Sequence, residues 1–481
     1  QTNHKLGVFM QEAYHYFGSK QLKTAKTHEV RNPYNNELVT LRADSTKEDA
    51  LEMLKIANHA KKAAKHSTLA QRISWLEDVA NKLQAQKESF AQTLTSETAK
   101  PITFARIEVE RCVEVLKITA ATMMTTTGET INTDAVASGK KSEAYYKREA
   151  AGVVVAITPF NFPLNLVAHK LAPALVCGNA VILKPTPEAP MIAYRFAQLF
   201  IESEYAIKDA LSVIYGDAEV GSTLVASDIP RVISFTGSVP VGRIIMQSAG
   251  IKKVSLELGG NAATFIEKSA DLAYAAARCA FGAFSNSGQV CISLQRIYVQ
   301  SEVYEEFSDL IAKETLKLKV GSCYEEETFM SALINEEAAT RAKHWIDAAV
   351  NEGARLINGG EQNKNVITPA VLADVTDDMS IVCEEVFAPI VSLVKVDSFD
   401  EAVEKMNSSP YGLQFSIFSD SVALAKRAIN EFESGGVVIN DVPTVRFDIQ
   451  PYGGVKFSGV GREGAQYAIE EMSEIKAVIF A

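Results

Sequence analysis

The sequence contains few cysteines and no cysteine pair. Six cysteines occur in 481 residues, and none belongs to a CxxC spacing. Sparse, irregular cysteines are typical of a reducing compartment, where thiols stay free. The sequence also lacks a basic block, because 48 Lys and Arg stand against 59 Asp and Glu, a net charge of -11. We therefore predict a cytoplasmic protein whose main partner is neither nucleic acid nor an anionic membrane surface.

A membrane-spanning segment and a secretory leader are also missing. The longest uncharged run, residues 150–168, is about long enough to cross a bilayer, but it contains Gly152, Pro159 and Pro163, which are costly in hydrocarbon. The first thirty residues have no basic, then apolar, then small-residue cleavage pattern. Because the chain starts at Gln1, a leader removed earlier stays an open alternative.

Two common nucleotide-binding signatures are absent. No GxGxxG fingerprint occurs, and the segment most like a phosphate loop, residues 216–223, has no lysine before Ser222. Without that cation, a nucleoside triphosphatase loses the charge that would hold its phosphates. A strand-to-helix turn is the better interpretation of this segment.

The hydrophobic pattern predicts an α/β fold. Residues 46–118 have helical periodicity, and residues 142–151 form an extended, arm-like segment. From Gly152 onward, apolar runs of strand length alternate with helical stretches, as in parallel strands covered on both faces. The expected strands fall into two sets, which predicts two α/β units: residues 153–157, 180–183, 211–214, 232–235, 253–256 and 263–266, then 296–299, 366–372, 390–396 and 436–439.

Three residues could carry catalytic chemistry. Cys291 lies in a polar, glycine-containing loop where a nucleophile could be exposed, although a buried, inert cysteine is commoner. Glu257 ends an apolar strand before two glycines, so it is either a paired structural acid or a general base with a raised pKa. Asn161 lies between two prolines, where a rigid amide could donate to an oxyanion or simply cap a turn.

A fourth feature could bind phosphate. The strand that ends in Ser234-Phe235-Thr236 is followed by a small-residue turn, Gly237-Ser238, and then by a helix. Free N–H groups at such a helix start can receive a phosphate. The signal is weak alone, because many α/β crossovers share this pattern.

Seven motifs are spread over nearly the whole chain. They are TPFNFP (158–163), LKP (183–185), FTGS (235–238), LELGG (256–260), GQVC (288–291), EEVFAP (384–389) and PYGGVKFSG (451–459). In this order they resemble the aldehyde dehydrogenase superfamily, and seven ordered motifs are far more specific than any one of them. The stretch before the last motif, residues 440–448, resembles the branch that acts on lactaldehyde, phosphonoacetaldehyde and, without phosphorylation, glyceraldehyde 3-phosphate.

The resemblance implies the aldehyde dehydrogenase fold: two Rossmann-like parallel-sheet domains and a β-strand oligomerisation arm. It places the cofactor-binding domain at residues 1–127 and 151–258, the catalytic domain at 259–445, and the arm with the C-terminal segment at 128–150 and 446–481. It also implies a homodimer or homotetramer, and no metal.

The same resemblance assigns roles to residues. Cys291 would be the nucleophile, Glu257 the general base and Asn161 an oxyanion donor. The cofactor, NAD or NADP, would contact Thr158, Pro159, Phe160, Lys184, Glu188, Gly237, Ser238, Gly259, Glu385 and Phe387. Thiolate addition to an aldehyde would give a thiohemiacetal, loss of hydride to the cofactor a thioester, and Glu257-activated water a carboxylic acid.

Two departures from the family pattern bear on specificity. Pro187 stands where many NAD-preferring relatives have a glutamate, so NADP is tolerated, while Glu188, one residue later, could still favour NAD. Val290 stands where phosphate-using relatives often have an arginine before the nucleophile. We therefore expect a small, unphosphorylated hydroxy- or oxo-aldehyde such as lactaldehyde or succinic semialdehyde. Arg446 would contact its carboxylate or hydroxyl, or form a structural ion pair with Asp448 or another acid.

Alternative functions stay open at this stage. Phosphonoacetaldehyde or glyceraldehyde 3-phosphate could be the substrate. A cofactor-free amidase or thioesterase could use Cys291, Glu257 and a lysine, but the motifs at Lys184, Gly237 and Glu385 would then have no assigned function. A non-catalytic binding protein would not need Cys291, Glu257 and Asn161 together.

Overall fold

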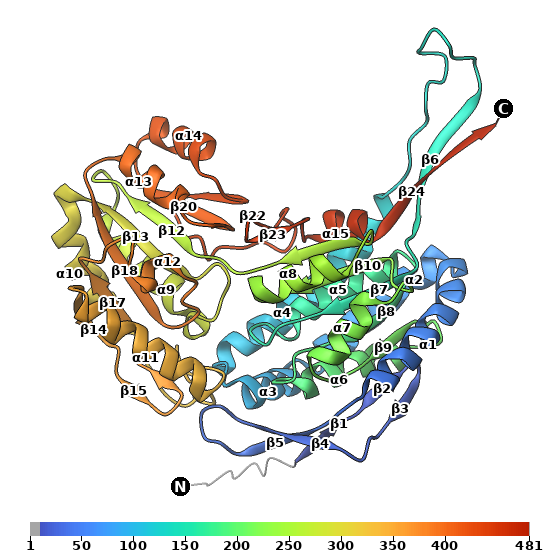
Figure 1. Ribbon diagram of the computed structural model, residues 1–481, viewed down its shortest axis with the longest axis horizontal. Helices are drawn as coiled ribbons and strands as arrows, with labels where there is room; N and C mark the ends of the chain where they lie inside the picture. The colour runs from blue at the N-terminus through green and yellow to red at the C-terminus, as the bar shows by residue number, and fades with distance from the viewer. Residues whose placement is uncertain (1–9, 481) are drawn as a thin grey trace.

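Residues 10–480 are described by the computed structural model, in which two large sheets lie side by side and a long arm projects from one of them (Figure 1). The first sheet has eight strands, of which β11, β10, β7, β8 and β9 are parallel neighbours. In spatial order its strands are β23 (Gly459–Val460), β11 (Lys253–Glu257), β10 (Val232–Thr236), β7 (Val153–Ile157), β8 (Ala180–Lys184), β9 (Leu211–Val213), β2 (His15–Phe17) and β3 (Lys20–Leu22).

Helices cover both faces of the first sheet. Successive strand residues point to opposite faces, so Val154 and Ala156 pack with one set of helices, and Val153 and Val155 with the other. The first set is α2 (Leu69–Ala85), α3 (Lys87–Thr98), α4 (Ile102–Thr125), α5 (Asn165–Val176), α6 (Pro190–Ile201) and α15 (Ala465–Glu471). The second set is α1 (Lys47–His66), α7 (Ala218–Ala226) and α8 (Val239–Ser248).

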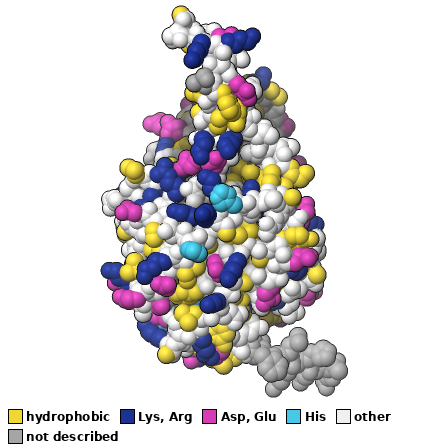
Figure 2. All heavy atoms as spheres, turned by 90° about the vertical axis from the view of Figure 1, so that its right-hand side faces the viewer, with side chains coloured by type: hydrophobic (Ala, Val, Ile, Leu, Met, Phe, Trp, Pro, Cys, Tyr) yellow, Lys and Arg dark blue, Asp and Glu magenta, His cyan; other side chains and the backbone are white. Residues whose placement is uncertain are grey.

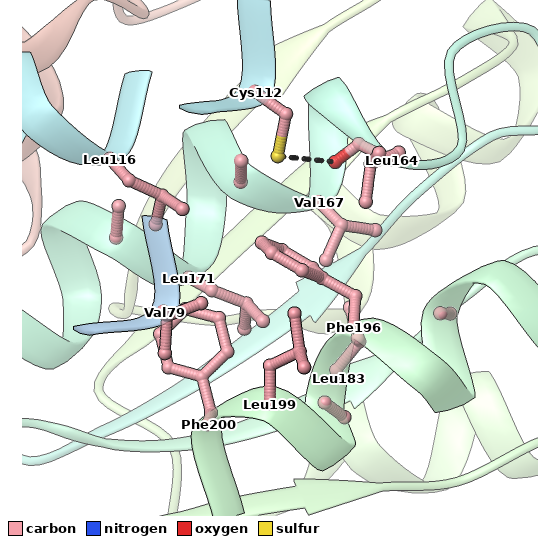
Figure 3. Packing of buried hydrophobic residues seen from close by; sticks show 14 of the residues in the cluster. Val79, Cys112, Leu116, Leu164, Val167, Leu171, Leu183, Phe196, Leu199 and Phe200 are labelled. Atoms are coloured by element: carbon pink, nitrogen blue, oxygen red, sulfur yellow. Dashed lines mark hydrogen bonds between the residues drawn. The ribbon is translucent and has the colours of Figure 1, made fainter. Parts of the chain in front are cut away.

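The larger core of this unit is packed mainly with aromatic and aliphatic side chains (Figure 3). Phe196 and Phe200 of α6 meet edge to face at 5.2 Å between ring centroids, and they face Leu171 of α5 and Leu183 of β8. All four side chains are fully buried. Burying a side chain of this size stabilises the fold by about 1.5–3 kcal/mol, so this core holds the strand ends that carry the candidate site.

The second sheet has seven strands and is parallel except at one edge. Its spatial order is β14 (Arg355–Asn358), β17 (Ala370–Ala373), β18 (Ile390–Val396), β13 (Leu294–Gln300), β12 (Ala262–Ile266), β20 (Gln414–Phe418) and β21 (Gly436–Ile439). Helices α9 (Leu272–Phe284) and α10 (Tyr304–Thr315) pack on one face. On the other face lie α11 (Glu336–Asn351), α12 (Ser380–Cys383), α13 (Phe399–Asn407) and α14 (Val422–Glu431).

The arm consists of β6 (Glu143–Ala150) and β24 (Ser473–Phe480), paired antiparallel along their whole length. It extends away from both sheets (Figure 1). Ile475, Ile479 and Phe480 on β24 are each more than half exposed. Figure 2 shows this side of the molecule, where Lys and Arg side chains below the arm are interspersed with Asp and Glu.

Short strands complete the fold. They are β1 (Gln11–Ala13), β5 (Leu38–Ala43) and β4 (Thr27–Arg31) in one three-stranded sheet, and the pairs β15 (Gln362–Asn363) with β16 (Val366–Ile367) and β19 (Tyr411–Gly412) with β22 (Val455–Lys456). Two short 3₁₀ turns, η1 (Ser285–Gly288) and η2 (Ser301–Val303), flank β13. Within residues 10–480, no helix is long and apolar enough to cross a membrane.

The expected α/β fold class is confirmed, with two differences in detail. The segment predicted as one strand at 366–372 is two strands, β16 and β17, because Pro369 between them has no N–H for a ladder. The helical segment at 46–118 is four helices, separated near Ser67, Gln86 and Pro101. Asp271 caps α9 by accepting a hydrogen bond from the Tyr274 N–H. All six cysteines are free.

Candidate active site

A cavity of about 750 Å³ contains every site residue predicted from the sequence. Its lining includes Cys291, Glu257, Asn161, Thr158, Pro159, Phe160, Lys184, Glu188, Gly237, Ser238, Gly259, Glu385, Phe387 and Arg446. These residues come from segments that lie far apart in sequence, so the fold brings them together.

Strand register explains why the cofactor motifs meet. In the first sheet Ile157 lies opposite Lys184, Phe235 opposite Ile157, and Thr236 opposite Glu257. These residues end four parallel strands, β7, β8, β10 and β11, at one edge of the sheet. Ligands of open α/β sheets bind outside the carboxyl ends of the strands. The loops that follow these strands therefore line the same side of the cavity.

Cys291 lies in the turn between α9 and β13. Before it, Asn286, Ser287 and Gly288 all have positive φ angles, of 51°, 56° and 70°, which coil the chain tightly. At Gly288 a Cβ atom would overlap the Ala388 carbonyl, so this position requires glycine. The turn is held by buried groups, since Ser287 Oγ donates to the Ser331 carbonyl oxygen. The cysteine is thus presented by a rigid loop.

The Cys291 thiol is in an apolar surrounding with one polar neighbour. Its sulfur packs near Val290, Ile292 and Leu413, and it lies 2.9 Å from the Tyr452 hydroxyl. The pKa of Cys291 is raised to about 11, chiefly by burial, although the Tyr452 hydroxyl and the charge of Arg446 act to lower it. A nucleophile in this cavity therefore depends on its neighbours to become a thiolate.

Glu257 is buried and has no partner for its carboxylate. It is 3% exposed, and within residues 10–480 neither carboxylate oxygen has a hydrogen bond. Burial and the nearby Glu463 carboxylate hold the pKa of Glu257 well above its ordinary value of 4.5. An unpaired buried acid is costly to stability, so this side chain matches a group kept free for proton transfer rather than a structural ion pair.

Asn161 lies in the loop between β7 and α5. Its side-chain Oδ1 accepts the Phe162 N–H at 3.2 Å. Its backbone carbonyl accepts hydrogen bonds from Lys100 Nζ at 2.8 Å and from Asn286 Nδ2 at 3.2 Å. Because Asn286 belongs to the turn before Cys291, the two loops are directly bonded.

The other end of the cavity has groups suited to a dinucleotide. Lys184 lies at the end of β8 and is mostly buried, which lowers the pKa of its ammonium group. Glu188 accepts a hydrogen bond from the Thr186 hydroxyl beside it. Ser238 precedes α8, and its side chain makes no cap to that helix. Charged and small polar groups therefore surround this end, as recognition of ribose and phosphate requires.

Between the two ends lie Glu385 and two aromatic rings. Glu385 Oε1 accepts the Gly260 N–H at 3.0 Å, and burial raises the pKa of Glu385 to about 7. A Cβ on Gly259 would overlap the Glu385 carboxylate, so a larger residue here would displace that carboxylate from its present position. Phe160 and Phe387 meet edge to face at 5.9 Å between centroids. The buried hydroxyls of Thr158 and Thr236 have no hydrogen-bond partner among the described residues, so they are available to a ligand. The residues at this part of the cavity therefore fit NAD or NADP.

Arg446 both lines the cavity and forms an ion pair. Its Nη2 donates to Glu463 Oε2 at 3.0 Å, its Nε lies 3.9 Å from Asp448, and its guanidinium covers the Tyr452 ring at 3.7 Å. The pair expected with an acid is thus present, chiefly with Glu463. Within residues 10–480 the buried Nε has no hydrogen bond, so the group retains capacity for a ligand.

Several groups of the site were not predicted from the sequence. Lys170 Nζ contacts Glu463 Oε1 at 3.1 Å, and Arg111 donates twice to Asp448, which also bonds His169. His169 and Lys170 give one detectable signal, because they are polar side chains inside a largely apolar helix. Tyr452 lies in the motif at 451–459. Arg111 gives no signal, because its contacts join segments distant in sequence.

The chain is similar to known proteins over nearly its whole length. The Aldehyde dehydrogenase family matches residues 21–478. A 3-sulfolactaldehyde dehydrogenase of Priestia aryabhattai is 40% identical over 96% of this chain and 97% of its own length, and a lactaldehyde dehydrogenase of Methanococcus aeolicus is 38% identical over 94% and 97%.

Solved structures of other proteins have the same fold as this chain. Aldehyde dehydrogenase 21 from Physcomitrella patens, in complex with the reaction product succinate, is 35% identical, covers 98% of both chains and has a TM-score of 0.95. Glyceraldehyde-3-phosphate dehydrogenase GapN from Methanocaldococcus jannaschii, complexed with NADP, is 35% identical over 95% of this chain and all of its own, with a TM-score of 0.91. This chain belongs to the aldehyde dehydrogenase family, and the prediction of an NAD(P)-dependent aldehyde dehydrogenase is confirmed.

Proposed function

We propose that this protein oxidises a small, unphosphorylated hydroxy- or oxo-aldehyde, such as lactaldehyde or succinic semialdehyde, to its carboxylic acid with NAD or NADP. One observation carries the proposal: a single cavity holds Cys291, the unpaired carboxylate of Glu257 and the Asn161 loop beside the cofactor motifs. Each of the three supplies a different requirement of aldehyde oxidation, namely a nucleophile, a base and an oxyanion donor.

The first half of the reaction depends on Cys291 and Asn161. The thiolate attacks the aldehyde carbonyl and forms a thiohemiacetal, whose oxyanion accepts hydrogen bonds from Asn161 Nδ2 and the Cys291 backbone N–H. Donors fixed before the reaction stabilise the developing charge without reorganisation. The residues of the cofactor motifs would hold NAD or NADP, whose nicotinamide would supply the acceptor for the hydride that leaves the substrate carbon. A thioester on Cys291 then remains.

The second half depends on Glu257. Its carboxylate takes a proton from water, and the resulting hydroxide attacks the thioester, so that the acid leaves and the thiol returns. Lys170 and Arg446 hold Glu463 beside Glu257. Keeping two cations next to Glu463 limits the repulsion between the two carboxylates. A carboxylate at position 257 favours hydrolysis over transfer of the acyl group to coenzyme A.

Two arginines support a substrate with a small polar or anionic tail. Arg111 and Arg446 both line the cavity. A guanidinium group donates readily to a carboxylate or a hydroxyl, so either arginine could hold such a tail. The names of the relatives agree in chemistry, since they include lactaldehyde and 3-sulfolactaldehyde dehydrogenases and a structure with bound succinate.

Phosphorylated aldehydes are the second candidate. Two structural relatives are glyceraldehyde-3-phosphate dehydrogenases. Against this candidate, the residue before the nucleophile is Val290, which is buried in an apolar cluster. An apolar side chain at that position offers no donor to a phosphate.

We also propose domain bounds, an oligomeric state and a cellular location. We assign residues 1–127 and 151–258 to cofactor binding, 259–445 to catalysis, and 128–150 with 446–481 to the oligomerisation arm. The exposed apolar side chains of β24 support a homodimer or homotetramer, because a second copy would remove them from water. Six free cysteines support a cytoplasmic location.

The test is cofactor reduction by purified protein. NAD and NADP are each offered with lactaldehyde, succinic semialdehyde, glycolaldehyde, phosphonoacetaldehyde and glyceraldehyde 3-phosphate, and Cys291→Ala is the control. We expect cysteine-dependent reduction with lactaldehyde or succinic semialdehyde. Faster turnover of a phosphorylated aldehyde would contradict the proposed substrate class, and no reduction with any aldehyde by folded protein would favour the cofactor-free hydrolase.

A further inference from the structure

Lys100 is buried beside the Asn161 loop, and every partner that it has belongs to the site. It is 2% exposed and lies just before α4. Its ammonium group donates to Glu108 and to the Asn161 carbonyl at 2.8 Å, and it lies 4.0 Å from the centroid of the Phe162 ring. An ammonium group has three donors. Two carry hydrogen bonds, and the charge also faces an aromatic ring, which attracts cations.

Glu108 holds the far end of the same loop. It is 1% exposed, and besides Lys100 it accepts the N–H groups of Leu164 and Asn165 on Oε1, at 2.9 and 3.1 Å. These N–H groups lie at the start of α5, where a negative charge is favourable. The loop between Asn161 and Asn165 is therefore tied to α4 at both ends by one buried ion pair.

The Asn161 carbonyl is the point where three segments meet. It accepts Lys100 from the α4 side and Asn286 from the turn before Cys291. Moving this carbonyl would shift the attached side chain, and with it the amide that faces the cavity. An error of about 1 Å in a catalytic group can cost a hundredfold in rate.

Stability alone does not account for this pair. Replacing a buried ion pair with uncharged groups of similar volume is often neutral or stabilising. Glutamine in place of Glu108 could still accept the Leu164 and Asn165 N–H groups, so a residue 100 that served only the fold could then be apolar. We propose that Lys100, held by Glu108, is a positioning residue that fixes the Asn161 amide at the place where the oxyanion forms next to Cys291. This inference rests on the proposed function, because it assigns Asn161 to the oxyanion.

The test is a double-mutant cycle on acylation of Cys291 by p-nitrophenyl acetate. The thiolate attacks the ester carbonyl through an oxyanion, an acetyl thioester forms and p-nitrophenolate leaves, so no cofactor or aldehyde is needed. Lys100→Met with Glu108→Gln removes both charges, while Gln keeps an oxygen for the Leu164 and Asn165 N–H groups. This neutral-pair variant is measured with Asn161 and with Asn161→Ala, after subtraction of the Cys291→Ala rate.

We expect non-additive losses. Asn161→Ala should slow acylation about a hundredfold. The neutral-pair variant should slow it about tenfold when Asn161 is present and less than about twofold when Asn161 is already alanine, because residues that act through one another do not add. An equal loss in both backgrounds overturns the proposal, since Lys100 would then act independently of Asn161.

A second readout separates the oxyanion donor from the thiol. Iodoacetamide alkylates Cys291 by displacement at a saturated carbon, where no oxyanion forms. The neutral-pair variant should therefore alkylate within about twofold of wild type. A loss equal to the loss in acylation would show that the thiol itself has moved, which also overturns the proposal.

Two controls keep the result interpretable. Phe200→Leu, in the core of the same unit (Figure 3), lowers stability without touching the loop and should show no coupling to Asn161. If the neutral-pair variant does not fold, Lys100→Leu with Glu108→Gln, which also leaves no buried charge unpaired, takes its place, with the same non-additivity expected and additivity again overturning the proposal. Aldehyde oxidation by the wild type is recorded separately, so a failure of the proposed substrate chemistry is distinguished from a failure of the cycle.

Discussion

The Cys291 sulfur lies 2.9 Å from the Tyr452 hydroxyl, although 161 positions separate the two residues. Tyr452 is itself covered by the Arg446 guanidinium. A hydroxyl bonded to a thiol can donate to the thiolate once it forms, and a cation behind the ring strengthens that donor. This contact thus favours the thiolate and opposes the burial that raises the pKa of the thiol.

Tyr452→Phe should make Cys291 harder to ionise. The pKa of the thiol is already raised to about 11, chiefly by burial, and the tyrosine hydrogen bond keeps it from rising further. Without that bond the pKa rises further, so less thiolate exists at any pH below it. A hydrogen bond to a charged group is worth about 1.5–3 kcal/mol, so iodoacetamide alkylation near pH 8 should slow about tenfold or more, with its pH profile displaced to higher pH.

The control for this change is Tyr298→Phe. Tyr298 is buried and bonded to Arg296, but it does not line the cavity. Its alkylation profile should match wild type. An unchanged profile in Tyr452→Phe would mean that the tyrosine does not stabilise the thiolate.

Glu257→Gln should separate oxidation from hydrolysis. Glutamine keeps the shape of the side chain but cannot accept a proton from water. We expect one rapid equivalent of reduced cofactor per active site, followed by turnover slower by about 10²–10⁴-fold. Intact-mass measurement should show the acyl group on Cys291. A variant that is slow from the first turnover, with no acyl adduct, would show that Glu257 is needed in a step that precedes formation of the thioester.

The same residue predicts a pH dependence. Because burial and Glu463 raise the pKa of Glu257 above 4.5, it stays protonated at pH values where an exposed glutamate is charged. Only the carboxylate can act as base, so hydrolysis should weaken as pH falls through this raised pKa and strengthen as pH rises. In Glu257→Gln the residual rate of hydrolysis should no longer fall in this pH range. Single-turnover decay of the acyl adduct at several pH values measures it, and an identical profile in the variant would contradict the assignment.

The fold could be predicted from local patterns, and most strands lie where apolar runs were found. The run at 153–157 is β7, and the run at 390–396 is β18. A strand buried on both faces must be apolar throughout, so its sequence shows its length. The break at Pro369 could have been predicted as well, because proline cannot donate within a sheet.

The site could be predicted only where its residues sit in motifs. Cys291, Glu257 and Asn161 follow strands or glycine turns that mark them, and the cavity contains all three. Lys100 and Arg111 lie on or near an ordinary amphipathic helix, and no periodicity distinguishes them from surface charges. Their roles depend on contacts with residues 61 and 337 positions away. Such contacts follow from tertiary packing and leave no local pattern.

Glu188→Gln should shift preference from NAD toward NADP. Glu188 lines the end of the cavity that holds Lys184, and Pro187 before it has no acceptor in its side chain. A carboxylate there bonds ribose hydroxyls and repels a 2'-phosphate. Removing its charge should raise the ratio of NADP to NAD affinity about tenfold, since about 1.4 kcal/mol is typical for one close charge. Dissociation constants from fluorescence titration measure it, with the exposed Glu352→Gln as control, and an unchanged ratio would exclude Glu188 from nucleotide selection.

Arg111→Gln should weaken binding of an anionic aldehyde and spare a neutral one. Arg111 lines the cavity, and its side chain is 26% exposed, so its loss is tolerated better than loss of the buried Arg446. Its bonds to Asp448 hold the guanidinium in place, and glutamine removes the positive charge that an anionic tail would meet.

The expected result is a KM for succinic semialdehyde about tenfold higher, with kcat little changed, because the tail binds equally in the ground and transition states. The KM for lactaldehyde, which carries no charge, should change less than about threefold. Arg106→Gln is the matched control, because Arg106 lies one turn earlier on α4 and pairs with Glu88 and Glu326 outside the cavity. An equal rise of KM for both aldehydes would show that Arg111 supports the cavity wall through Asp448 and does not bind the charged group of the substrate.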